Sequence, residues 1–235
     1  MDHREALTRL RSLACPGDGP GLVTVLTEEP WPADSLQLIG DGLLTAVADG
    51  IDGAPEVART CVQALAERGW EGDRELAMAL EATPGGGPPP TLLPLPVDLE
   101  DLAMILEGDP AYGGGRVDLR TGEVWPQSAV EYAEEMGELD EKDEDPDRWL
   151  WVDCRGSHQA YRDMERFIEN LDDKALADRL TDAICGRGAF RRFKVRLSDQ
   201  PELMTRWHTF SNDRHRGRAR SWLAAEGYTP VRRTD

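Results

Sequence analysis

Apolar residues recur at helical spacing through the first third of the chain. Residues 36–47 and 57–65 place an apolar side chain at every third or fourth position, which gathers these side chains on one face of a helix. Gly53-Ala54-Pro55 separates the two stretches, and Pro55 suits the first turn of the second helix. We therefore predict a helical accessory domain over residues 1–82, built as a small helical bundle of four or five short helices.

A segment rich in proline and glycine follows this helical pattern. Residues 83–90 hold three glycines and four prolines. Such a segment cannot continue a helix or a central strand, because glycine lowers helix propensity and proline lacks a backbone N–H. We predict a linker over residues 83–96 and a second domain over residues 97–235.

The pattern changes after the linker. Asp98 suits the N-cap of a helix whose apolar residues follow at helical spacing. Residues 116–120 alternate between polar and apolar, Thr121-Gly122 suits a turn, and residues 123–125 suit a second strand that runs back along the first. Together they indicate a β-hairpin. Residues 148–154 predict a third strand. Because this strand is apolar on both faces, we expect it at the centre of the sheet.

From Ser157 onward, apolar stripes predict further helices. Two of these helices meet at Gly186-Arg187-Gly188, where two glycines suit a tight turn. The stripes that contain Trp207 and Trp222 predict two more helices, and Gly227 is expected to end the last one. The fold class that follows is α+β: a short antiparallel sheet, made of the hairpin plus one further strand, covered by four or five helices.

Charge divides the chain into an acidic body and a basic end. The chain has 45 Asp and Glu against 27 Lys and Arg, a net charge of −18. Residues 186–235 reverse this balance, with 12 Lys and Arg against 5 Asp and Glu. Two interpretations stay open at this stage. The basic end binds a polyanion, or it pairs with the acidic body within the fold.

Five arginines of the basic end are candidate ligand-binding residues. They lie on or beside two predicted helices. Where these helices converge, the arginines offer guanidinium groups that bind phosphate in a bidentate fashion. The leading hypothesis is a non-catalytic binding or regulatory protein whose basic C-terminal helices bind an anionic ligand such as nucleic acid or a nucleotide. The candidate residues are Arg187, Arg191, Arg192, Arg214 and Arg218.

A second hypothesis is a hydrolase-type enzyme that acts on a phosphorylated substrate. Its candidate catalytic residues are Asp118 and Asp153 on predicted strands, together with His158, and the hypothesis requires these three to converge in one pocket. A solvated sheet face or a salt bridge explains the two aspartates equally well. No cofactor is predicted, because the chain has no Walker-type or dinucleotide-binding glycine motif. No metal site is predicted, because the cysteines and histidines lack a recognisable ligand spacing.

An acidic segment supports a third hypothesis, an acidic protein-interaction or immunity-type factor. Residues 131–148 contain ten acidic residues against Lys142 and Arg148, which predicts a solvated loop over residues 131–147. In one interpretation this loop competes for a basic partner, and in the other it only raises solubility. A protein partner is expected through this loop or through the N-terminal helices.

Several segments of the second domain resemble a known bacterial family. In order, they are VDLEDLAMILEG, VDLRTGEVW, an acidic insert, YRDMERFIENL, AICGRGAFRRFK, RWHTF and RGRARSWLAAEGY. This series is similar to Uncharacterised Protein Family 0158 over about residues 97–228. Its most specific part is residues 186–194 followed by Trp207 and Phe210. The resemblance implies that this part of the chain is a domain of that family. It implies no catalytic residues, because the family has no assigned activity.

The sequence also bears on location. No apolar run approaches the roughly 20 residues that a membrane-spanning helix needs. The N-terminal segment is charged and amphipathic, unlike a secretory signal. The four cysteines are widely spaced and form no CxxC pair, which is typical of reduced thiols. We expect a cytoplasmic protein with no membrane partner.

Overall fold

The computed structural model of this chain describes residues 18–82, 92–137 and 145–232, together with Arg9, Ser12 and Leu13. Most of the predicted linker, residues 83–91, lies outside the described residues. So do residues 138–144 of the acidic segment.

The predicted N-terminal helices are present. Their apolar faces enclose one buried cluster that includes Ile39, Leu43 and Leu65, each with no exposed surface. Pro55 lies in the first turn of its helix, as its fixed φ angle favours. The elements are α2 (Gly19–Glu28), the short 3₁₀ helix η1 (Ala33–Ser35), α3 (Leu36–Ala48), α4 (Ala54–Arg68) and α5 (Asp73–Glu81).

The predicted β-hairpin is confirmed. It consists of β2 (Gly115–Asp118) and β3 (Val124–Pro126), and β4 (Trp149–Val152) adds the third antiparallel strand. The expectation that this third strand is central is wrong, because the strand order is β3-β2-β4. All four residues of β2 are buried, whereas β4 lies at an edge and leaves Trp151 62% exposed.

Part of the acidic segment is helical rather than a loop. The helix α7 (Gln127–Met136) covers its first residues, and η4 (Pro146–Arg148) covers its last. Val130 and Ala133 are buried on one side of α7, while its glutamates are exposed. The high proportion of acidic residues hid this amphipathic pattern, because only two positions of the helix need to be apolar for it to pack.

A second, two-stranded sheet was not predicted. It pairs β1 (Leu93–Leu95), which lies within the segment predicted as a linker, in parallel with β5 (Tyr228–Pro230) near the end of the chain. The helix α6 (Leu99–Leu106) follows β1 and is capped as expected. The carboxylate of Asp98 accepts hydrogen bonds from the backbone N–H groups of Glu100 and Asp101.

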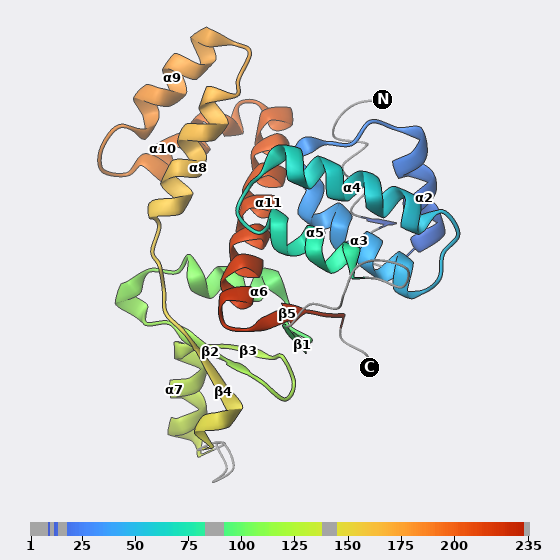
Figure 1. Ribbon diagram of the computed structural model, residues 1–235. Helices are drawn as coiled ribbons and strands as arrows, with labels where there is room; N and C mark the ends of the chain where they lie inside the picture. The colour runs from blue at the N-terminus through green and yellow to red at the C-terminus, as the bar shows by residue number, and fades with distance from the viewer. Residues whose placement is uncertain (1–8, 10–11, 14–17, 83–91, 138–144, 233–235) are drawn as a thin grey trace.

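The prediction that the C-terminal helices cover the sheet is wrong for most of them. Helices α6 and α7 contact the three-stranded sheet. In contrast, α8 (His158–Glu169), α9 (Lys174–Ile184) and α10 (Ala189–Ser198) form a separate layer on the long helix α11 (Pro201–Ala225). Figure 1 shows this layer at the end of the molecule remote from the sheet and α7. The fold class remains α+β.

One continuous helix replaces the two that were predicted around Trp207 and Trp222. The helix α11 has 25 residues and ends as expected before Gly227, whose φ is 93°. Trp207 belongs to the buried cluster shared with α8–α10, and Trp222 belongs to the cluster shared with α6 and the sheets. As Figure 1 shows, α11 runs between the N-terminal bundle on one side and α8–α10 on the other. None of the helices described is long and apolar enough to span a membrane.

Candidate functional site

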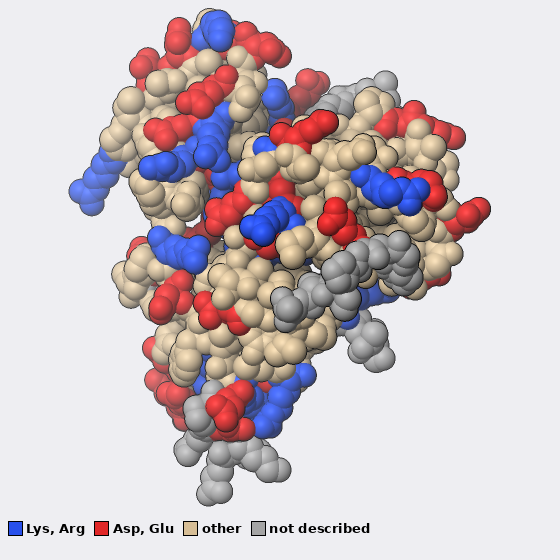
Figure 2. Space-filling model, in the orientation of Figure 1, with Lys and Arg blue, Asp and Glu red and all other residues tan. Residues whose placement is uncertain are grey.

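A groove lined by arginines lies between α9 and α10. Its volume is about 720 Å³. Residues 174–198 carry seven Lys and Arg against two Asp, and Figure 2 shows blue side chains gathered over this part of the molecule. The side chains that line the groove are Arg179, Asp182, Ala183, Gly188, Arg191, Arg192, Val195 and Arg196.

The local sequence explains why these arginines point outward. Gly186 and Gly188 adopt φ angles of 79° and 83°, which confirms the predicted tight turn between the two helices. In α10, Phe193 is buried against Trp207, with ring centroids 4.8 Å apart. Because Phe193 faces the core, Arg191 and its neighbours on the opposite side of the helix face solvent.

The arginines of α10 and of the turn before it differ in how they are bonded. Arg192 donates hydrogen bonds to the carbonyl oxygens of Ala183 at 2.9 Å and Cys185 at 2.7 Å, so it holds the end of α9 in place. Arg187, Arg191 and Arg196 are exposed. Within the described part of the chain, no carboxylate lies within ion-pair distance of these three guanidinium groups. Their guanidinium groups are therefore open to an anion from solvent, and Asp182 is the acidic residue that also lines the groove.

The other two candidate arginines are buried in the protein. Arg214 and Arg218 are each 5% exposed, and both contact Asp163 on α8. The nitrogen–oxygen distances are 3.0 Å for Arg214 and 2.8 Å for Arg218. Arg218 also pairs with Glu107. Contact with a ligand would require breaking these buried ion pairs, so we leave both arginines out of the candidate surface. For these two arginines of α11, the structure therefore favours pairing within the fold over binding of a polyanion.

Two further arginines of α11 face the opposite side of the helix. A step of two residues rotates a side chain by about 200°, so the four arginines at alternate positions from 214 to 220 divide into two opposed pairs. Arg216 and Arg220 reach Asp41 of the N-terminal bundle, and Arg220 also donates to Gln37 at 2.9 Å. These contacts fit the interpretation in which the basic end of the chain pairs with its acidic body.

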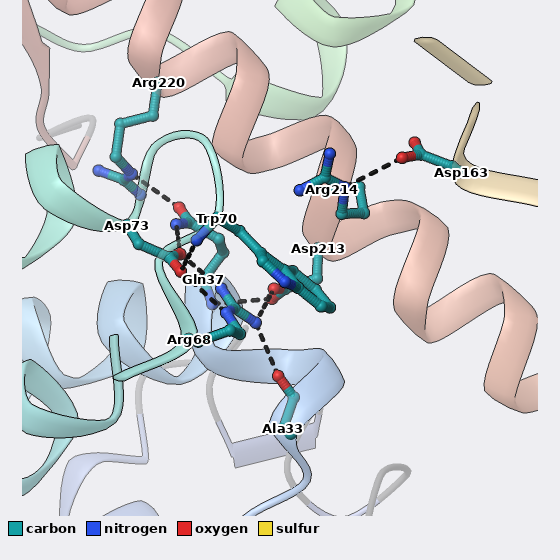
Figure 3. A network of polar contacts seen from close by, with 9 residues as sticks. All are labelled: Ala33, Gln37, Arg68, Trp70, Asp73, Asp163, Asp213, Arg214 and Arg220. Carbon is teal, nitrogen blue, oxygen red and sulfur yellow. Dashed lines mark hydrogen bonds and ion pairs between the residues drawn. The ribbon is translucent and has the colours of Figure 1, made fainter. Parts of the chain in front are cut away.

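A buried network joins the bundle to α11 (Figure 3). Arg68 donates to Asp73 at 2.6 Å and to Asp213 at 2.5 Å, and Asp213 also accepts the backbone N–H of Gln37. Burial raises the pKa of Asp213 to about 6, although Arg68 acts in the opposite direction. No motif pointed to this network, since its members lie far apart in the sequence.

The candidate catalytic residues do not converge. Asp118 is 1% exposed and pairs with Arg148 at 2.5 Å. It lies opposite Trp149, at one end of the β2–β4 pair, whereas Asp153 follows the other end. Asp153 and His158 are both exposed, and His158 accepts a hydrogen bond from Arg162. The pocket that the enzyme hypothesis requires is therefore not formed by these three residues.

A Ser–His–Glu cluster that the sequence analysis missed lies beside α11. The Nε2 atom of His215 is 3.2 Å from the Ser211 hydroxyl and 2.8 Å from a Glu107 carboxylate oxygen. A catalytic triad uses the two ring nitrogens for different partners. Here both partners share one nitrogen, so the cluster is a structural contact. No group of three or more potential metal-ligating side chains occurs among the residues described.

Glu107 makes stability depend on pH. Burial alone would raise its pKa, but hydrogen bonds and charge from His215 and Arg218 lower the pKa below the usual 4.5. A carboxyl with a lowered pKa stabilises the fold above its unfolded pKa, and this stability is lost as the pH falls through the folded value. We expect Glu107→Gln to lower the free energy of unfolding at about pH 7 and to flatten its decline toward about pH 3. Urea unfolding at several pH values measures this.

Glu100→Gln is the control for this prediction, because Glu100 also pairs with an arginine but is 58% exposed. Because an exposed ion pair contributes little, this variant should lose less stability at about pH 7 than Glu107→Gln does. An unchanged pH dependence in Glu107→Gln would contradict the assignment.

Comparison with known proteins identifies the family of residues 98–235. The profile of the family described as Uncharacterised protein family (UPF0158) matches residues 98–235. The chain belongs to this family. A UPF0158 protein of Pseudomonas aeruginosa, PA5073, is 30% identical over 142 residues, which cover 60% of this chain and 89% of the relative. No solved structure matches the chain. The UPF0158 region contains the groove and α11, whereas the N-terminal bundle lies outside the matched residues.

Proposed function

We propose that the protein is a non-catalytic binding or regulatory protein that binds an anionic ligand, such as nucleic acid or a nucleotide, in the groove between α9 and α10. The observation that carries the proposal is the contrast between two sets of arginines. Those of α11 are bound by carboxylates of the fold, whereas Arg187, Arg191 and Arg196 are exposed without such a partner in the described chain. Unneutralised guanidinium groups around one groove favour an anion.

The surroundings of the groove favour recognition of phosphate over recognition of bases. Of the two aromatic residues of α10, Phe193 is buried and Phe190 is half-buried against the same cluster, so neither offers an open stacking platform. The net charge of −18 repels a polyanion from the rest of the surface. We therefore expect a short stretch of phosphates to be engaged, with little dependence on base sequence.

Fluorescence anisotropy with short labelled RNA and DNA, single- and double-stranded, tests this proposal. The informative variant is Arg191→Gln/Arg196→Gln, because both side chains are exposed and neither holds the turn in place. Losing two charge-assisted contacts should weaken binding by about tenfold or more. Thermal unfolding should be unchanged, since no ion pair of the described chain is removed.

The matched control is Arg59→Gln/Arg120→Gln. These two arginines are 69% and 58% exposed and lie outside the groove. The control makes the same change in net charge, so its affinity should stay near that of the wild type. Equal weakening in both double variants, or no binding by the wild type even at low salt, would contradict the proposal.

A further inference from the structure

The outer face of α7 is apolar where a surface helix is normally polar. Tyr132 and Met136, one helical turn apart, are 59% and 57% exposed. Glu131 and Glu135 form a neighbouring row with the same spacing, and both are exposed. The buried side of the helix is the other one, which holds Val130 and Ala133. The exposed face of α7 is thus an apolar stripe beside an acidic one.

The α9–α10 groove has the complementary character. Val195 lies between Arg191 and Arg196 and is 58% exposed, so the groove offers an apolar side chain flanked by guanidinium groups. Figure 1 shows α7 and the α9–α10 pair at opposite ends of the molecule. The exposed side of α7 carries glutamates, whereas residues 174–198 carry mostly Lys and Arg. Two such surfaces cannot meet within one chain.

We propose that α7 of one copy docks into the α9–α10 groove of a second copy. Glu131 and Glu135 would face the groove arginines, while Tyr132 and Met136 would cover Val195. An arginine above the Tyr132 ring adds a cation–π contact. This is the helix-in-groove mode, with anchors one turn apart. The inference rests on the proposed function, because it uses the same groove as an anion-binding site.

Such a contact has consequences for assembly and for ligand binding. It joins two different surfaces, so it builds open chains or a closed ring rather than a symmetric two-chain dimer. A groove that holds α7 cannot hold another anionic ligand. Self-association and ligand binding therefore exclude each other, and protein concentration regulates access to the groove.

Charge reversal tests the contact by sedimentation velocity over a wide range of protein concentration. The wild type should form species of at least twice the 26.1 kDa monomer mass at high concentration. Glu131→Arg/Glu135→Arg makes both surfaces basic, and Arg191→Glu/Arg196→Glu makes both acidic. Each variant alone should stay monomeric. An equimolar mixture of the two variants, and a single chain carrying all four changes, should associate again.

Two control variants reverse the same number of charges outside α7 and the groove. Glu165→Arg/Glu169→Arg reverses two exposed glutamates of α8 at the same spacing, and Arg59→Glu/Arg120→Glu reverses two arginines outside the groove. Both should associate like the wild type. A wild type that is monomeric at every concentration would overturn the inference, and so would association that survives the reversals or is not restored in the mixture.

The oligonucleotide anisotropy assay separates this inference from the proposed function. Glu131→Arg/Glu135→Arg keeps its groove free, so it should bind the labelled oligonucleotide several-fold more tightly than the Glu165→Arg/Glu169→Arg control at high protein concentration. Oligonucleotide binding by a strictly monomeric wild type would overturn the docking and leave the proposed function standing. Restored association in the mixture, with no variant binding the oligonucleotide, would overturn nucleic-acid binding and leave the docking standing.

Discussion

Replacing Asp163 with alanine is expected to lower the free energy of unfolding by about 3–5 kcal/mol. Asp163 is 1% exposed and holds Arg214 and Arg218, which are themselves 5% exposed. Removing the carboxylate leaves two buried cations with one remaining acidic partner, Glu107, for Arg218. Chemical unfolding in urea, followed by circular dichroism, measures the loss.

Two further variants show whether the loss comes from uncompensated charge. Asp172→Ala removes an exposed aspartate and should change stability by well under 1 kcal/mol, as surface substitutions do. Adding Arg214→Met and Arg218→Met to Asp163→Ala should recover much of the stability, because apolar side chains can replace a buried ion network. A loss of less than about 1 kcal/mol in Asp163→Ala would contradict the burial of this network.

Replacing Gly72 with alanine should cost about 2–5 kcal/mol, from left-handed backbone strain together with overpacking. Gly72 has a φ angle of 86°, and a Cβ atom there would lie 2.1 Å from the Gly217 carbonyl oxygen on α11. The neighbouring atom is backbone within a helix, so it cannot move aside cheaply. The substitution would push the N-terminal bundle away from α11, and urea unfolding measures the cost.

Gly69→Ala provides the matched control in the same connection between α4 and α5. Gly69 also has a left-handed φ, 62°, but a Cβ atom there would meet nothing within 4 Å. Its cost should be limited to the conformational strain, about 1–2 kcal/mol. Equal losses in the two variants would indicate that the close approach of Gly72 and Gly217 does not restrain the fold.

Much of the fold follows from local pattern. The N-terminal helices, the hairpin at residues 116–125 and the turn at Gly186-Arg187-Gly188 each have a periodicity or a turn residue that identifies them. The arginines of α10 were also found from sequence. The buried spacing of Phe193 and Leu197 fixes which side of that helix faces solvent, and the charged positions then follow.

What the sequence did not reveal depends on contacts between distant segments. Whether Arg214 and Arg218 face solvent is decided by Asp163 and Glu107, which lie 51 and 111 residues away from the arginines they bind. The pairing of β1 with β5 is equally non-local. The central position expected for β4 was wrong for a different reason, since its apolar run includes Trp151, which lies exposed on an edge strand.

The arginines of the C-terminal region divide into two sets. Those of α11 pair with carboxylates of α3, α6 and α8 and of the residue that ends α6, and we propose that those of the α9–α10 groove bind an anion. The N-terminal helices are also joined to α11 by buried charges. Arg68, Asp73 and Asp213 form a buried network that fixes the bundle to the UPF0158 region, so the bundle is part of one structure with the groove.

The salt dependence of oligonucleotide binding tests this division of the arginines most directly. Each phosphate neutralised by a cationic side chain adds about 0.7–0.9 to the magnitude of the slope of log K against log salt concentration. Arg191→Gln/Arg196→Gln should therefore have a slope smaller in magnitude than that of the wild type by about 1.4–1.8. The Arg59→Gln/Arg120→Gln control should retain the wild-type slope. A slope unchanged by the loss of Arg191 and Arg196 would contradict the assignment of the groove as the anion-binding site.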